Sequence, residues 1–257
     1  MIYNKNKGLL VMATSAFKTV ESKILNTLDY DKIWSYSDFR EVPFDSAAKA
    51  LSVLCQKNII KRIQKGFYYR PKQTILGETV PDYLNLVFLK LDKKGAFYCV
   101  SGLNGFNAIG LTTQMPNITT VACDCPMINT DKVKFIQRKR PQSCTAIERI
   151  VLDALIDIDK IPDTTEAKTI LKIKEFIKAQ KVSINDLGIS ALSETARVRA
   201  IVGALGQELH LDKEILSKLK ASLNPSTGYF LKVNSVLKYA QEWNIKSRDN
   251  AKIFKRK

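Results

Sequence analysis

The 257-residue chain contains a single histidine, His210, and none of its five cysteines forms a CxxC pair. A tetrahedral zinc site needs four close nitrogen or sulfur ligands, so this composition argues against structural zinc. A Ser-His-Asp or Cys-His catalytic site would have to use His210, which we place at a helix end as a surface or capping residue. Glycine-rich phosphate-binding motifs are also missing. We therefore expect no cofactor, no metal and no enzymatic activity.

Long hydrophobic runs are absent as well. No apolar stretch approaches the ~18 residues that span a bilayer, and the one that follows Lys7 is shorter than a secretory signal requires. Apolar residues make up 45% of the chain and charged residues 26%, a composition typical of globular proteins. The odd number of cysteines favours free thiols in a reducing compartment. The sequence predicts a soluble cytoplasmic protein that does not enter a membrane.

Acidic residues are scarce, and they are missing altogether from one segment. The chain has 41 Lys+Arg against 25 Asp+Glu, a net charge of +16, which favours a polyanionic partner such as nucleic acid or a membrane surface. Residues 47–72 carry seven basic residues and no acidic one. A segment of one charge sign repels itself unless a counter-charge is supplied. We expect DNA phosphates to supply it.

The N-terminal third has the element order of a winged helix-turn-helix. Apolar spacing predicts a helix over residues 16–29, a short segment at 35–39 and a second helix that Pro43-Phe44-Asp45 opens, with Asp45 or Ser46 as its cap, and that ends near Asn58. A β-hairpin is predicted next. Apolar and polar residues alternate over 59–64, Lys65-Gly66 supplies a turn, and an aromatic run precedes Pro71.

The remaining chain is mixed and then helical. We expect a helix at 82–91, strands at 96–100, 117–123 and 132–136, and helices at 146–158, 165–179, 193–209, 213–219 and 233–243. The predicted fold class is α+β, with a winged helix-turn-helix over residues 1–75 and a C-terminal domain over 76–257. Residues 76–140 of that domain are mixed α/β and 141–257 are mainly helical; the division near Pro141 is compatible with one domain.

The second predicted helix has a face suited to a major groove. Ala47, Leu51 and Leu54 form its buried stripe, which leaves short, amide-bearing and cationic side chains opposite. We expect DNA contacts from Ser46, Lys49, Ser52 and Gln56 toward bases, from Lys61, Arg62, Lys65 and Arg70 toward phosphate or the minor groove, and from Lys57. Any solvated helix face can have this composition, and the cationic hairpin beside it is what favours DNA. For Tyr68 and Tyr69 we expect one ring to pack on the base of the wing rather than to contact bases.

Two other patterns have alternative explanations. Asp157-Ile-Asp159 has the D-x-D spacing of a two-metal nucleotidyltransferase site, but these acids end an amphipathic helix and follow no phosphate-binding loop. The segment from Ser101 to Pro116 is rich in glycine and asparagine. It could surround a ligand, with Gln114 as the residue to test first, but we favour close packing of a short helix on a strand.

Two motifs resemble the AbiEi-type antitoxins and related bacterial regulators. One runs from Ala50-Leu51 through Leu54, then Ile59-Ile60-Lys61-Arg62-Ile63 and Lys65-Gly66-Phe67-Tyr68-Tyr69-Arg70-Pro71, and is similar to that family's wing. The other is Ser101-Gly102, Asn107, Gly110-Leu111-Thr112-Thr113-Gln114 and Pro116, similar to its middle domain, although Gly105 and Phe106 stand where the family has small alanines.

The resemblance implies a winged helix-turn-helix that represses its own promoter by binding inverted repeats. Because a single winged domain covers a short DNA site, we expect two copies on a palindrome, supplied by a homodimer or by side-by-side binding. The resemblance also implies a type IV toxin-antitoxin role in abortive infection, with a functional link to a nucleotidyltransferase-like toxin. Two other function classes stay open on the residues alone. The winged unit could be a protein-interaction module that docks an acidic partner, or the chain could process nucleic acid enzymatically through Asp157 and Asp159.

Overall fold

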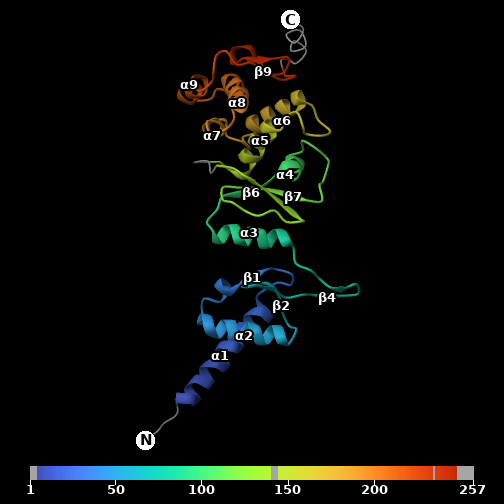
Figure 1. The fold of residues 1–257 in the computed structure, drawn as a ribbon, viewed down its shortest axis with the longest axis vertical. Coiled ribbons are helices and arrows are strands. Elements are labelled where there is room, and N and C mark those ends of the chain that lie inside the picture. Colours follow the sequence, from blue (N-terminus) through green and yellow to red (C-terminus); the bar gives the residue numbers. More distant parts are fainter. Residues whose placement is uncertain (1–4, 140–143, 234, 248–257) are drawn as a thin grey trace. The chain divides into compact units, whose positions relative to one another are not determined.

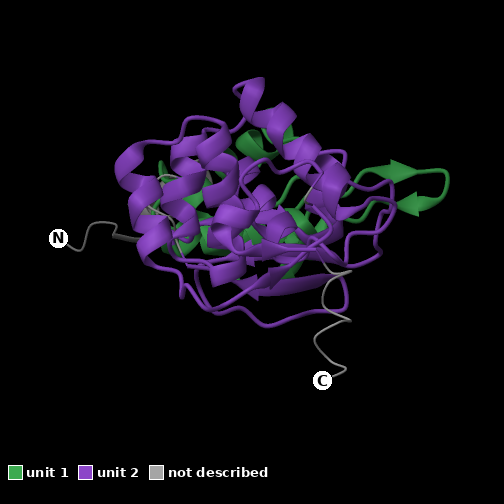
Figure 2. Ribbon diagram, turned by 90° about the horizontal axis from the view of Figure 1, so that it is seen from above, with its two compact units in different colours: residues 1–94 green, residues 95–257 purple. Residues whose placement is uncertain are grey.

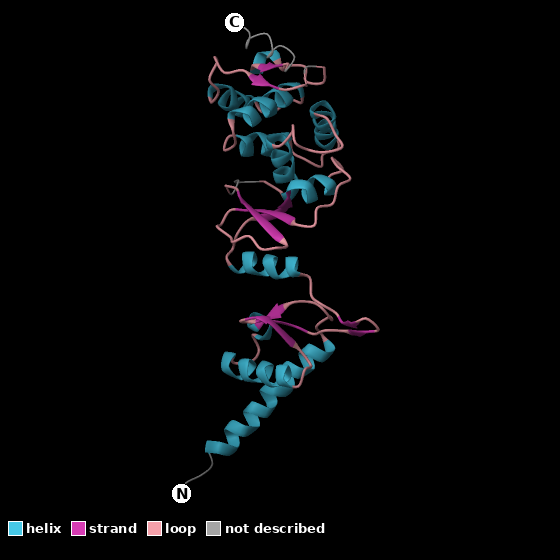
Figure 3. Ribbon diagram, turned by 45° about the vertical axis from the view of Figure 1, so that its right-hand side comes forward, coloured by secondary structure: helices cyan, strands magenta, loops and turns pink. Residues whose placement is uncertain are grey.

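The computed structural model describes residues 5–139, 144–233 and 235–247 and divides into two compact units, Met1–Lys94 and Gly95–Lys257 (Figure 2). Both units contain helices and small sheets (Figure 1, Figure 3), so the chain has the α+β fold that its sequence predicts. Residues 76–94 group with the first unit, whereas the sequence suggested a division after residue 75. In the part of the chain that is described, no helix is both long and apolar enough to cross a membrane.

The first unit contains the helix, short helix, helix and hairpin in the predicted order. Its elements are α1 (Lys5–Asn26), β1 (Trp34–Ser35), the 3-10 helix η1 (Tyr36–Phe39), α2 (Phe44–Gln56), β2 (Lys61–Gln64), β3 (Phe67–Tyr69), β4 (Gln73–Thr74), β5 (Gly77–Glu78) and α3 (Tyr83–Lys93). Strands β1, β3 and β2 form an antiparallel sheet in that order. Strands β4 and β5 form a second hairpin, which the sequence did not predict.

The core of the first unit joins α1, α2 and the sheet. Leu51 and Leu54 of α2 are completely buried together with Ile24 of α1. Trp34 of β1 stacks on Tyr68 of β3, with ring centroids 5.6 Å apart. Because these apolar residues recur every three or four positions on each helix, each helix buries one face and leaves the other in solvent.

Helix α3 belongs to the first unit because it packs on the hairpin. Leu86 is buried in one cluster with Ile33 and Phe67, and the Lys93 ammonium lies 4.2 Å from the centre of the Phe67 ring. Asp82 caps the helix by accepting a hydrogen bond from the Leu84 amide at 2.9 Å. The Phe67 contacts join residues far apart in the sequence, which is why composition along the chain placed the boundary too early.

The second unit begins with a small mixed sheet and continues with helices. Its elements are β6 (Tyr98–Ser101), α4 (Gly102–Ala108), β7 (Thr119–Cys123), β8 (Val133–Gln137), α5 (Ala146–Ile156), α6 (Glu166–Lys178), α7 (Ile184–Ala191), α8 (Ala196–Glu208), α9 (Lys213–Ala221), β9 (Tyr229–Phe230), η2 (Gln241–Trp243) and β10 (Ile245–Lys246). Strand β7 lies between β6, which is antiparallel to it, and β8, which is parallel. The three sheet strands agree with the predicted ones to within a few residues.

One predicted helix of this unit is wrong and one helix was missed. Residues 235–243 form successive single turns and the short η2, whereas the sequence predicted a helix over 233–243; residue 234 lies outside the described residues. The apolar side chains of this stretch have helical spacing because Val233, Leu237 and Ala240 all face the core. Lys174 donates a hydrogen bond to the Val236 carbonyl at 2.5 Å. The missed helix is α7, whose Ser183 cap accepts from the Asp186 amide.

A buried ionic network connects the sheet of the second unit to its helices. The side chains of Arg149 and Asp153, one turn apart on α5, are each 1% exposed and meet at 2.8 Å. Arg149 also binds Glu194 at 2.5 Å, and Asp153 accepts hydrogen bonds from Arg138 at 2.8 Å and from the Ser101 hydroxyl at 2.5 Å. These contacts join residues on both sides of Pro141, so the mixed and the helical parts form one unit.

We expect Asp153→Asn to lower the free energy of unfolding by about 3–5 kcal/mol, because it removes one of the two carboxylates that pair with the buried Arg149 charge and the carboxylate that pairs with Arg138. The measurement is urea unfolding followed by circular dichroism. The matched control is Lys218→Ala, which removes an ion pair to Glu214 whose side chains are 59% and 76% exposed and should cost less than about 1 kcal/mol. Equal effects of the two substitutions would contradict the structural role of the network.

Candidate nucleic-acid interface

Helix α2 presents most of its predicted contact residues to solvent. Lys49, Ser52 and Gln56 are exposed, and Ser46 is half-buried. Their exposure follows from the burial of Ala47, Ala50, Leu51 and Leu54 on the opposite side. In the described part of the chain Lys49 makes no ion pair. The exposed face therefore offers one free ammonium, hydroxyls and an amide along about three turns of helix.

The start of α2 differs from the prediction and adds an aromatic pair. The helix begins at Phe44 with Pro43 as its N-cap and no side-chain cap; the expected cap at Asp45 or Ser46 is wrong because both residues already lie inside the first turn. The Phe44 side chain is 64% exposed, and its ring centre lies 4.9 Å from that of Tyr36. The sequence analysis treated Phe44 only as a helix start; because Phe44 lies seven residues before Leu51, helical spacing places it on the same side as the buried stripe and could not have identified it as a surface residue.

Two cations of the β2–β3 hairpin are engaged within the first unit. Lys61 forms an ion pair with Glu78 of β5. Arg70 lies 4.1 Å from the centre of the Tyr30 ring and donates hydrogen bonds to the Tyr30 hydroxyl at 2.6 Å and the Leu25 carbonyl at 3.1 Å. Both contacts come from outside the acid-free segment 47–72, so a charge count along that segment could not find them.

The other predicted cations remain at the surface. Lys65 is exposed at the hairpin turn, where Gly66 has a φ of +83°, and no ion pair of Lys65 occurs within the described residues. Arg62 is exposed and donates to the Gln64 carbonyl at 3.3 Å. Burial raises the pKa of the Cys55 thiol in α2, and the Arg62 charge partly offsets that rise. Lys57 is exposed and its ammonium is 5.3 Å from the centre of the Phe17 ring.

Both tyrosines of β3 are buried, whereas the sequence predicted packing of one ring. Tyr68 is 3% and Tyr69 is 8% exposed. The Tyr68 hydroxyl lies 2.7 Å from that of Tyr36. Burial, followed by this hydrogen bond, raises the pKa of Tyr68 far above its ordinary value. Tyr68 therefore stays protonated and links the hairpin to η1, which places the Lys65 turn beside the start of α2.

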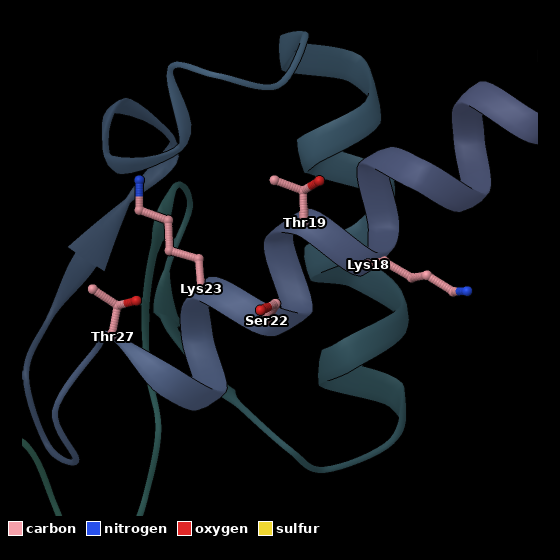
Figure 4. Close-up of a pocket in the computed structure, with 5 residues that line it drawn as sticks. All are labelled: Lys18, Thr19, Ser22, Lys23 and Thr27. Carbon is pink, nitrogen blue, oxygen red and sulfur yellow. The ribbon is translucent and has the colours of Figure 1, made fainter.

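The outer side of α1 carries a shallow hollow of about 530 Å³ (Figure 4), lined by Lys18, Thr19, Ser22, Lys23 and Thr27. Figure 4 shows the Lys18 and Lys23 side chains pointing in different directions. Lys23 is already bound to the Asp38 carbonyl at 2.5 Å and to Glu41 at 2.8 Å. Because Lys18 and Lys23 diverge, this hollow has no convergent pair of ammonium groups.

The remaining sequence candidates have structural contacts. Asp157 pairs with Lys160 at 2.8 Å and Asp159 with Arg197 at 3.7 Å, and within the described residues no group of three His, Cys, Asp or Glu is placed to hold a metal ion. His210 is exposed just after α8 with a φ of +61°, the helix-end position that the sequence predicted.

The segment from Ser101 to Pro116 is closely packed at α4, as expected. A Cβ at Gly105 would lie 3.0 Å from the Val100 carbonyl and 3.3 Å from the Ile150 side chain. Gln114 is exposed, and its backbone N–H donates to the Thr112 hydroxyl at 3.2 Å. The glycine at position 105 is thus explained by the approach of α4 to β6 and α5.

The Lys61–Glu78 pair makes a pH-dependent prediction. The hydrogen bond from Lys61 lowers the pKa of Glu78 below its ordinary value, and a weaker one from Gln73 acts in the same direction. Because the folded-state pKa is depressed, the stabilisation is present at neutral pH and is lost as the pH falls through that value. In an NMR titration, Lys61→Ala should raise the Glu78 pKa, and Gln73→Ala should raise it less. An unchanged Glu78 titration in Lys61→Ala would show that the pair does not form.

Comparison with known proteins identifies a family. The crystal structure of the RV2827C protein from Mycobacterium tuberculosis is similar over 84% of both chains, with 10% identity and a TM-score of 0.49. No curated protein matches the sequence. Residues 23–186 match the model of a family of unknown function, DUF6088, and this region includes α2, both hairpins and the sheet of the second unit. The chain belongs to the DUF6088 family.

Proposed function

We propose that the first unit is a winged helix-turn-helix that binds duplex DNA. Helix α2 lies in the major groove, and the β2–β3 hairpin is the wing that contacts the adjacent backbone. The observation that carries this proposal is the exposed polar face of α2 beside a cationic hairpin turn. Neither Lys49 nor Lys65 has an ion-pair partner among the described residues, so both ammonium groups are available to phosphates.

The side chains divide into base and phosphate contacts. Gln56 can pair with adenine through its amide, and Lys49 and Ser52 can reach base edges or phosphate. Exposed Phe44 supplies an apolar contact of the kind that reads a thymine methyl group. Lys57, Arg62 and Lys65 neutralise phosphates. Lys61 and Arg70 keep a supporting role, since their charged groups bind Glu78 and Tyr30.

The biological role that we propose is that of a cytoplasmic transcriptional repressor. A single winged unit covers a short site, so two copies on an inverted repeat would provide useful specificity. The likeness of the two sequence motifs to AbiEi-type antitoxins supports autorepression of a type IV toxin-antitoxin operon. In that role the second unit would counter a nucleotidyltransferase-like toxin. A neighbouring gene without such a toxin would remove the antitoxin role and leave the repressor.

The DNA proposal predicts the salt dependence of binding. Lys49→Ala and Lys65→Ala should each weaken binding to a random-sequence duplex and flatten the slope of log affinity against log salt by about one unit, because each removes one phosphate contact. Fluorescence anisotropy between about 50 and 200 mM salt measures the slope.

The control is Lys213→Ala, which removes an exposed lysine of the second unit and should leave the slope unchanged. Two results would contradict the proposal that α2 and the hairpin turn contact DNA phosphates. One is a wild-type chain that does not bind random-sequence DNA, and the other is a salt slope that Lys49→Ala and Lys65→Ala leave as unchanged as Lys213→Ala does. Binding of an acidic protein with no DNA competition would then favour the protein-interaction alternative.

A further inference from the structure

Residues 72–79 form an arm that carries two aliphatic side chains at its tip. Strands β4 and β5 pair through Gln73–Glu78 and Thr74–Gly77, and Ile75 and Leu76 occupy the turn between them. Ile75 is 105% and Leu76 is 99% exposed, more than any other large apolar side chains among the described residues. Figure 1 shows the arm extending away from the helices of its own unit. The tip therefore buries none of its apolar surface in the free chain.

Polar contacts fix the direction of the arm at its base. The Thr79 hydroxyl accepts a hydrogen bond from the Lys72 amide at 2.8 Å and donates one to Asp31. Glu78 binds Lys61 of the wing strand β2 and accepts from Gln73 at 2.9 Å. The Thr74 hydroxyl donates to the Gly77 carbonyl at 2.6 Å, and Gly77 has a φ of +107°. These contacts hold the base of the arm against the first unit and fix the conformation of its turn.

The small area of the tip indicates what kind of partner it fits. A stable protein interface buries roughly 800 Å² on each partner, and two aliphatic side chains supply only a fraction of that area. Proteins that bend DNA instead insert one or two apolar side chains, commonly Leu or Ile, between base pairs from the minor groove. That groove is only about 6 Å wide, and a two-residue turn is narrow enough to enter it.

The charges around the arm also favour DNA. Lys72 stands at its base without an ion pair among the described residues, and the one acid of the arm, Glu78, is paired with Lys61. The arm begins at the open end of the cationic β2–β3 hairpin, opposite the Lys65 turn and beside Lys61. A duplex that runs along this hairpin would meet both the Lys65 turn and the arm without a second protein chain.

We propose that the arm inserts Ile75 and Leu76 between base pairs from the minor groove and kinks the DNA. This inference rests on the proposed DNA binding of the first unit. Lys72 would meet a phosphate beside the insertion point, and the contacts to Asp31 and Lys61 would hold the arm in place while the bases unstack. A protein of this kind binds most tightly where the DNA is already easy to kink.

The test uses the full chain and two duplexes of the same arbitrary sequence, one fully paired and one with a central unpaired bulge. The wild type should bind the bulged duplex roughly tenfold more tightly, because the bulge removes the cost of unstacking. The double variant Ile75→Ser/Leu76→Ser should bind both duplexes equally and keep the wild-type salt slope. Both side chains are outside the core, so the fold should be unaffected. Ile128→Ser, an 88%-exposed isoleucine of the second unit, should behave as wild type.

The outcomes separate this inference from the proposed function. A wild type that binds the paired duplex without preferring the bulge, or a double variant that keeps the preference, overturns the wedge and leaves DNA binding standing. A wild type that binds neither duplex overturns both. Analytical sedimentation without DNA tests whether the tip binds a second copy of the chain instead. A dimeric wild type and a monomeric double variant would assign the tip to that second copy and overturn the wedge.

Discussion

The burial of one face of α2 is the constraint on which the first unit depends. Leu51 and Leu54 are completely buried against Ile24, and truncation of a leucine in such a position typically costs about 2–5 kcal/mol. The helix therefore cannot rotate about its axis to present another face. Lys49, Ser52 and Gln56 are exposed because the leucines are not, and a rigid polar face is what readout of a groove requires.

Local patterns predicted most elements of the fold. The helical spacing of Leu51 and Leu54, the alternation that ends at Lys65-Gly66 and the Asn58 position with a φ of +56° are signals carried by neighbouring residues. The β4–β5 arm gave no such signal, because strands of two residues, Gln73–Thr74 and Gly77–Glu78, are too short to show a period. The prediction of a helix over 233–243 was wrong for the opposite reason, because the spacing of Val233, Leu237 and Ala240 imitates that of a helix.

The candidate site was harder to predict than the fold because its charges are partnered at long range. The exposure of Lys49 and Lys65 follows from local spacing. The pairing of Lys61 with Glu78 and of Arg70 with Tyr30 depends on the path of the chain after residue 70 and on the end of α1. A composition count treats these four cations alike, whereas the structure divides them into free and engaged groups.

The motif in the second unit owes its unusual composition to packing and turns. Ser101 binds the buried Asp153, Asn107 donates to the Thr112 carbonyl at 3.1 Å, and Thr112 and Thr113 both donate to Asp163 at 3.1 Å. These hydrogen bonds lower the pKa of Asp163. The residues of this motif therefore join β6 to α5, α4 to the loop that follows it, and that loop to the loop before α6.

In the proposed complex, Lys61 and Arg70 would contribute to DNA binding by positioning the wing and the arm rather than by neutralising phosphates. Arg70 ties the end of β3 to α1, and Lys61 ties β2 to the arm. Substituting either residue would move the wing or the arm and weaken binding even if neither touches a phosphate. Affinity alone cannot distinguish the two effects, but the salt slope can, because counterion release depends only on the phosphates that are neutralised. A weaker complex with an unchanged slope is the result that a positioning residue should give.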